Sequence, residues 1–128
     1  MSAPLIIRVT VFEDSAFNVM ARVYGNNAEL VTAASMSTVT WAVTDMRSDA
    51  EIVAPTALVV SSVVFDSLQT GDEWDADEIG YNFLHTVPAS TFTDGGVRAQ
   101  IEYRATPVSG EPFDILWVRA TVLNAQSH

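Results

Sequence analysis

Residues 97–106 read Val-Arg-Ala-Gln-Ile-Glu-Tyr-Arg-Ala-Thr, an unbroken alternation of apolar and polar side chains. Successive side chains of a β-strand point to opposite faces, so this alternation predicts a strand with one face in a core and the other in water. Residues 113–123 form a second long β-favouring run, and the short segment between the two runs contains the turn pair Ser109-Gly110. Two such runs joined by a short glycine-containing loop predict a hairpin.

Outside this hairpin, β-type patterns recur with turn residues about every 8 to 15 positions. Residues 17–24 fit helical and strand spacing alike, and we expect them to be extended because their neighbours are strands. The predicted strands cover 5–12, 17–24, 30–34, 37–44, 57–65, 81–87, 97–106 and 113–123. We therefore expect an all-β fold of about seven strands in an antiparallel two-sheet sandwich, with a small barrel as the alternative. Residues 1–128 suit one domain, with tails at 1–4 and 124–128.

The charge balance excludes several classes of function. The chain has 16 acidic and six basic residues, a net charge of -10, no cysteine and, among the basic residues, only arginine. Six dispersed arginines do not make the cationic face that a nucleic-acid partner requires. Disulfides, thiol chemistry and lysine Schiff bases are excluded by composition. The longest apolar run, 57–65, is far shorter than the roughly 20 residues of a membrane helix. We expect no membrane partner and no secretory signal.

The main candidate for metal chemistry is the polar segment 72–78, which holds five carboxylates in seven residues. Clustered oxygen ligands can bind Ca²⁺, although the EF-hand spacing is absent and a solvated loop is the simpler interpretation. The candidate ligands are Asp72, Asp75, Asp77 and Glu78. Apart from this possible calcium ion we expect no cofactor.

The chain offers few groups for catalysis or for sugar binding. It has no nucleophile elbow, phosphate loop or dinucleotide fingerprint, and His85 alternates with apolar residues as a packed histidine does. We therefore expect no enzyme. Trp41 and Trp117 lie within alternating strands and are expected in the core, whereas Trp74 is expected on the surface. An exposed tryptophan keeps open an alternative function, a carbohydrate- or cell-surface-binding module that acts with or without calcium.

The second half of the chain resembles a known family. Residues 77–83, Asp-Glu-Ile-Gly-Tyr-Asn-Phe, resemble the turn before a late strand of immunoglobulin-like sandwiches, with Tyr81 at the position of the corner tyrosine. This sequence has one extra residue between the acid and the glycine, and it lacks the cysteine pair, which excludes an antibody-type domain. The later order of strand, Pro88, Gly95-Gly96, alternating strand and Gly110 is similar to immunoglobulin-like modules of tailed-phage virion proteins. The resemblance spans roughly residues 57–123.

This resemblance implies a structural or adhesive module of a virus particle, most simply a capsid decoration protein and otherwise a neck or tail component. The implied partners are other virion proteins or further copies of this chain in a homo-oligomer, and the implied location is the virion, after synthesis in the host cytoplasm. The candidate contact residues combine apolar positions and arginines at strand faces: Leu5, Ile6, Ile7, Trp74, Phe92, Arg98, Arg104 and Phe113.

Overall fold

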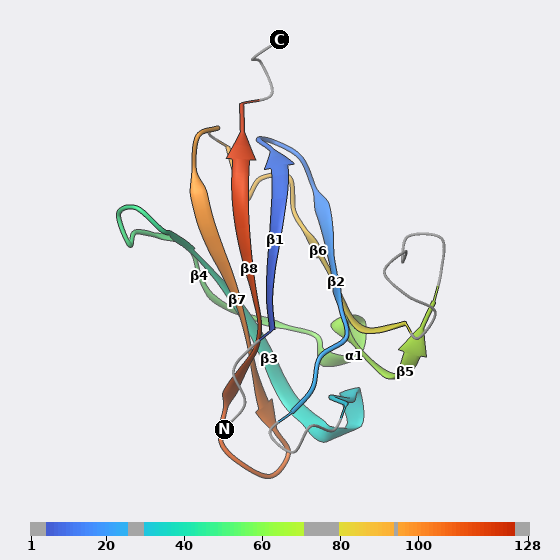
Figure 1. Ribbon diagram of the computed structural model, residues 1–128. Helices are drawn as coiled ribbons and strands as arrows, with labels where there is room; N and C mark the ends of the chain where they lie inside the picture. The colour runs from blue at the N-terminus through green and yellow to red at the C-terminus, as the bar shows by residue number, and fades with distance from the viewer. Residues whose placement is uncertain (1–4, 26–29, 71–79, 94, 125–128) are drawn as a thin grey trace.

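The computed structural model describes residues 5–25, 30–70, 80–93 and 95–124, which form two β-sheets packed face to face (Figure 1). The larger sheet consists, in spatial order, of β1 (Leu5–Phe12), β8 (Phe113–Leu123), β7 (Arg98–Pro107), β3 (Met36–Asp45) and β4 (Glu51–Leu58). The smaller sheet consists of β2 (Phe17–Ala21), β6 (Tyr81–Val87) and β5 (Val64–Gln69). Two short helical turns, η1 (Ala33–Ser35) and α1 (Val60–Val63), complete the described chain. The expected all-β, two-sheet fold is confirmed.

The core lies between the two sheets, where the inward side chains of β7 meet those of β6. Four alternate residues of β7 are fully buried: Ala99, Ile101, Tyr103 and Ala105. The ring of Tyr103 lies 4.8 Å, centroid to centroid, from the ring of Phe83 in the opposite sheet. β7 pairs with β8 in antiparallel register, so the hairpin that the alternation predicts is present. The alternation of apolar and polar residues therefore predicted correctly which face of β7 is buried.

The larger sheet differs from the expected antiparallel one at its first strand. β1 runs parallel to β8, in register from the pair Leu5 and Leu116 to the pair Phe12 and Leu123. The first and last strands of the chain are thus neighbours. Parallel pairing requires a long connection, which the whole intervening domain supplies here. β1 and β4 are the edges of this sheet, and β4 carries Pro55, a residue that sheets tolerate at an edge.

The described residues form eight strands where about seven were predicted, and the difference lies between residues 51 and 69. The predicted strand 57–65 is wrong: it contains the end of β4, the helical turn α1 and the start of β5. β4 is an edge strand of the larger sheet and β5 an edge strand of the smaller one, so the chain must cross between layers. The turn at Val60–Val63 makes that crossing, which one straight strand could not do.

The predicted short strand at 30–34 is also wrong. Leu30 forms only an isolated bridge with Tyr24, and the chain then turns into η1, which the side chain of Thr32 caps. This segment packs instead on a buried asparagine. The side-chain oxygen of Asn82 accepts from the backbone N–H of Val23 at 2.7 Å, and its amide nitrogen donates to the carbonyls of Val23 and Val31 at 3.0 and 2.7 Å.

Candidate functional site

A concave, arginine-lined part of the surface lies on the side of the five-stranded sheet turned away from the smaller sheet, here called the outer face. The outer positions of β7 alternate with its buried ones and carry Arg98, Gln100, Glu102 and Arg104. β8 contributes Arg119 at a half-buried position, and β1 contributes Arg8 at an exposed one. Four of the six arginines of the chain are therefore on this one face.

Three of these arginines border a shared hollow of about 490 Å³. Arg8 and Arg119 are directly paired across the parallel β1–β8 register, so their side chains leave the sheet side by side. Arg98 faces Thr121, which in turn lies beside Thr10. We call this place the arginine hollow, and its lining is made up of Arg8, Val9, Thr10, Met46, Arg98, Arg119, Ala120 and Thr121.

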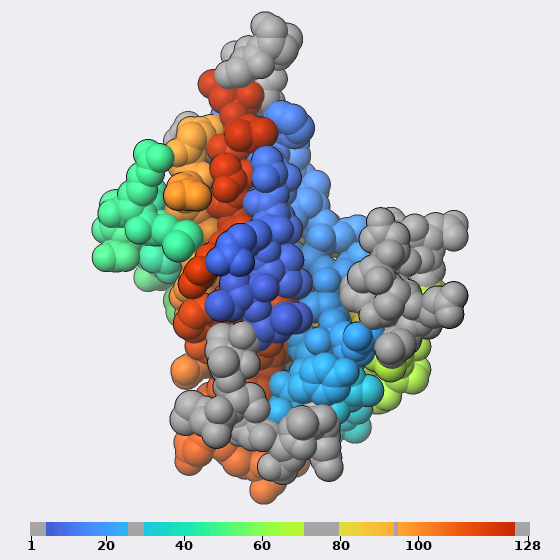
Figure 2. Space-filling view, in the orientation of Figure 1, coloured from blue at the N-terminus to red at the C-terminus, as the bar shows by residue number. Residues whose placement is uncertain are grey.

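The hairpin between β3 and β4 supplies one wall of the arginine hollow. The backbone N–H of Met46 donates to the carbonyl of Arg98 at 2.8 Å, and the N–H of Asp45 donates to the carbonyl of Ala50 at 2.8 Å. These bonds hold the base of the hairpin against the start of β7. In Figure 2, β8 (red) and β1 (blue) run side by side over the middle of the molecule, and the hairpin (green) stands out to their left.

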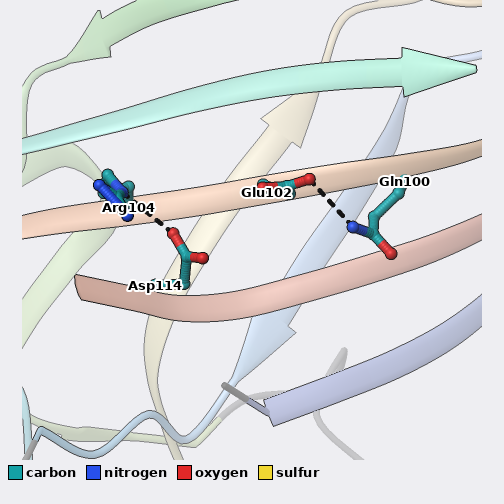
Figure 3. A network of polar contacts seen from close by, with 4 residues as sticks. All are labelled: Gln100, Glu102, Arg104 and Asp114. Atoms are coloured by element: carbon teal, nitrogen blue, oxygen red, sulfur yellow. Dashed lines mark hydrogen bonds and ion pairs between the residues drawn. The ribbon is translucent and has the colours of Figure 1, made fainter. Parts of the chain in front are cut away.

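A chain of polar contacts holds one arginine of the hollow in place. The carboxylate of Glu102 accepts from the side-chain amide of Gln100 at 2.9 Å, and the amide oxygen of Gln100 accepts from Nε of Arg119 at 3.2 Å. Figure 3 shows the contact between Glu102 and Gln100 and, further along β7, the ion pair between Arg104 and Asp114, at 3.2 Å. Gln100 thus binds only one of the five N–H donors of the Arg119 guanidinium.

The arginines of the hollow have no ion-pair partner within the described part of the chain. Among the described residues, Arg104 is paired with Asp114, but none of Arg8, Arg98 and Arg119 forms an ion pair with a carboxylate. The hollow therefore gathers three positive charges in a protein whose net charge is -10. Guanidinium groups present fixed forks of N–H donors that suit carboxylate and phosphate oxygens, so the chemistry of the hollow is anion recognition.

The interior holds a second polar group of residues. Nδ1 of His85 lies 2.7 Å from the hydroxyl of Tyr103, and the ring of Trp41 packs edge-on to the imidazole with 4.8 Å between centroids. Burial lowers the pKa of His85 and raises the pKa of Tyr103, so both are neutral at pH 7. A neutral imidazole with its proton on Nε2 accepts the tyrosine hydrogen bond at Nδ1. The interpretation of His85 as a packed, hydrogen-bonded histidine is confirmed.

The predicted contact residues do not form one surface. Leu5 and Ile6 are exposed on the edge strand β1 and Ile7 is half-buried against the core, while Arg98 and Arg104 are exposed on the outer face. Half-buried Phe113 lines a separate hollow of about 550 Å³ near the β7–β8 turn.

Phe92 was predicted to be a contact residue on the surface, and this prediction is wrong. It is 4% exposed and stacks on Phe17 with 6.3 Å between ring centroids, because the segment after β6 folds back onto β2. Trp74 and the calcium candidates Asp72, Asp75, Asp77 and Glu78 lie outside the described residues. Within the described ranges, no three acidic or histidine side chains are grouped as metal ligands.

The tryptophans give a mixed outcome. Trp41 is 7% exposed, as predicted for a core residue. Trp117 is not in the core between the sheets, because it occupies an outer position of β8 beside Ile6 and Glu102. Its indole N–H is buried and has no acceptor in the described part of the chain. Buried polar groups without a partner are rare, and a donor left in this state costs free energy of folding.

Sequence reasoning singled out Arg98 but missed that Arg8 and Arg119 would join it. Both arginines occupy polar positions of alternating strands, which was a visible signal for exposure. Their adjacency depends on the parallel pairing of the first and last strands, which no local pattern encodes. The burial of Asn82 was also missed, because the segment around Val23 and Val31 covers this polar residue only in the folded chain.

Comparisons with protein families, with curated proteins and with solved structures found no match for this chain. No helix in the described ranges is both long and apolar enough to cross a membrane. The candidate site therefore stands on its own geometry: a concave, arginine-lined hollow beside an exposed edge strand.

Proposed function

We propose that this protein is a non-enzymatic structural module with an immunoglobulin-like sandwich, and that it is a component of a tailed-phage particle. Capsid decoration is the role we favour, with the neck or tail as the other positions. Assembly proceeds through its exposed edge strand, either with further copies of the chain or with neighbouring virion proteins.

The strand order supports the immunoglobulin-like part of this proposal. In such domains strands B, E and D form one sheet, and C, F and G form the other, with an added strand C′ beside C in the variable type. The orders β2-β6-β5 and β4-β3-β7-β8 are compatible with B-E-D and C′-C-F-G. β1 then joins the larger sheet beside the last strand. In this correspondence Tyr81 begins strand E and not strand F, so it does not occupy the position of the corner tyrosine.

The edge strand β1 is the observation that carries the proposed assembly. Its far side has no partner strand in the described sheet, and Leu5 and Ile6 are 44% and 39% exposed there. Soluble proteins commonly protect such an edge with lysine, proline or a bulge. β1 has no lysine, proline or bulge between Leu5 and Phe12, and its one charged residue is Arg8, whereas the opposite edge strand carries Pro55. An exposed edge strand with an apolar start is suited to pairing with another chain.

The test is the mass of the purified protein in solution, together with its presence in intact particles. The expected result is a defined oligomer that Ile6→Lys converts to a monomer, because a charge at the edge opposes pairing. Val59→Lys is the matched control, since Val59 is 67% exposed on the connection after β4 and lies away from β1. A monomeric wild-type protein that is absent from every particle fraction would remove the proposal.

A further inference from the structure

The arginine hollow brings like charges together, and no ion pair among the described residues offsets their repulsion. Arg8 and Arg119 occupy directly paired positions on neighbouring strands, which lie about 4.8 Å apart in a sheet. Like charges at paired positions of a sheet destabilise it. Arg98 adds a third positive charge from β7, next to the pair. None of the described carboxylates forms an ion pair with these three arginines, and the nearby carboxylate of Glu102 is linked to Arg119 only through Gln100.

The donors of the hollow are partly fixed before any ligand arrives. Gln100 binds the Nε–H of Arg119 and is itself held by Glu102, which leaves the two terminal nitrogens of that guanidinium for a ligand. The hydroxyls of Thr121 and Thr10, which lie in one row across the strands with Arg98, add neutral donors to the lining. Pre-positioned donors lower the entropy cost of binding, so this arrangement favours recognition over a mobile charged surface.

Charge matching selects the class of ligand. One carboxylate would neutralise one of the three guanidinium groups, whereas a phosphate group carries close to two negative charges at pH 7 and offers three or four acceptor oxygens. A hollow of about 490 Å³ also falls within the usual size of small-molecule sites, so it has room for more than the phosphate itself. A long polyanion is disfavoured, because it would extend from the hollow onto a protein with net charge -10.

The geometry points to a phosphate-binding site: the arginine hollow formed by Arg8, Arg98 and Arg119 binds inorganic phosphate or the phosphate group of a small molecule. This site goes beyond the proposed structural role and does not depend on it. The fold alone brings the three arginines together, whatever the role of the protein. The bound anion offsets the repulsion between β1 and β8, so the ligand also strengthens the attachment of the first strand.

The experiment measures binding of inorganic phosphate by calorimetry, and the thermal midpoint of unfolding with phosphate or with chloride at equal ionic strength. Phosphate is expected to bind and to raise the midpoint. Arg8→Gln, Arg98→Gln and Arg119→Gln are each expected to weaken binding about tenfold, because each removes a charge-assisted contact. Glycerol phosphate and a short DNA duplex, tested in the same way, distinguish a small phosphate ester and a nucleic acid from the free ion.

Arg104→Gln is the matched control, since Arg104 lies on the same strand and face but is paired with Asp114 outside the hollow. Its phosphate affinity is expected to equal that of the wild type. Without phosphate, Arg8→Gln is expected to unfold at the same temperature as the wild type or at a higher one, because the repulsion is relieved. The proposal is overturned if phosphate does not bind, if Arg104→Gln weakens binding as much as the hollow variants do, or if only DNA binds.

Discussion

The two faces of strand β7 differ in how completely the chain itself satisfies them. The inner face, with Ile101 and Tyr103, is fully buried and meets partners from the other sheet. The outer face, with Arg98 and Gln100, carries charges and donors that are only partly used within the described residues. The inner face of β7 therefore stabilises the fold, while the outer face has hydrogen-bond donors and charges that can bind a ligand or a partner molecule.

The largest expected change in stability comes from a substitution on the inner face of β7, and it can be compared with a substitution on the outer face of the same sheet. Tyr103→Ala removes a fully buried ring that contacts Phe83 and His85, so it should lower the free energy of unfolding by about 3–5 kcal/mol. Thr44→Ala, on the outer side of neighbouring β3, should change it by about 0.5 kcal/mol or less. Urea unfolding of both variants makes the comparison. Equal losses would contradict the division between the faces.

A second variant extends the comparison to the polar part of the interior. Asn82→Ala leaves the backbone N–H of Val23 and the carbonyls of Val23 and Val31 without their buried partner. Each buried group left without a hydrogen bond costs about 1–3 kcal/mol, so we expect a loss of about 3 kcal/mol in urea unfolding. Asn18→Ala is the control, because it replaces the same residue type at an exposed position of β2, where its side chain accepts a hydrogen bond from Thr86 at the surface. If both variants lose the same stability, Asn82 is not a structural clamp.

The interior should also respond to pH. Burial lowers the pKa of His85 in the folded state, so between that value and the unfolded value of 6.5 the unfolded chain binds more protons. Stability contributed by neutral His85 is therefore complete above the unfolded pKa and is lost as the pH falls through the folded pKa. Unfolding from about pH 7.5 down to about pH 5.5 should show a steeper loss for the wild type than for His85→Phe. Parallel curves would contradict the assignment.

The smallest effect belongs to the outer face. The ion pair between Arg104 and Asp114 joins side chains that are 55% and 22% exposed, and exposed pairs contribute about 0–1 kcal/mol. Asp114→Asn should therefore lower the stability by less than about 1 kcal/mol, and high salt should remove most of the difference from the wild type. A loss as large as that of Asn82→Ala would mean that this face stabilises the fold after all.

The same residues show which parts of the fold and of the site could be predicted from the sequence. Alternation in β7 and β8 predicted strands, hairpin and buried face, because a period of two reports directly on the two sides of a strand. It failed at 57–65, where a β-favouring composition continues through the turn α1 that carries the chain between layers. The polar character of Arg8 and Arg119 was visible, but their pairing was not, since it joins residues more than a hundred positions apart. Tertiary contact also buried Asn82 against its local pattern.

The parallel pairing of β1 with β8 has a mechanical consequence. Leu5, at the beginning of β1, lies beside Leu116, and Leu123, at the end of β8, lies beside Phe12, so the chain leaves the pair at opposite ends (Figure 1). Tension applied between the two ends pulls the strands lengthwise past each other. The hydrogen bonds between β1 and β8 are then loaded together in shear and do not open one at a time. A domain held in this way resists stretching along the direction in which its own ends point.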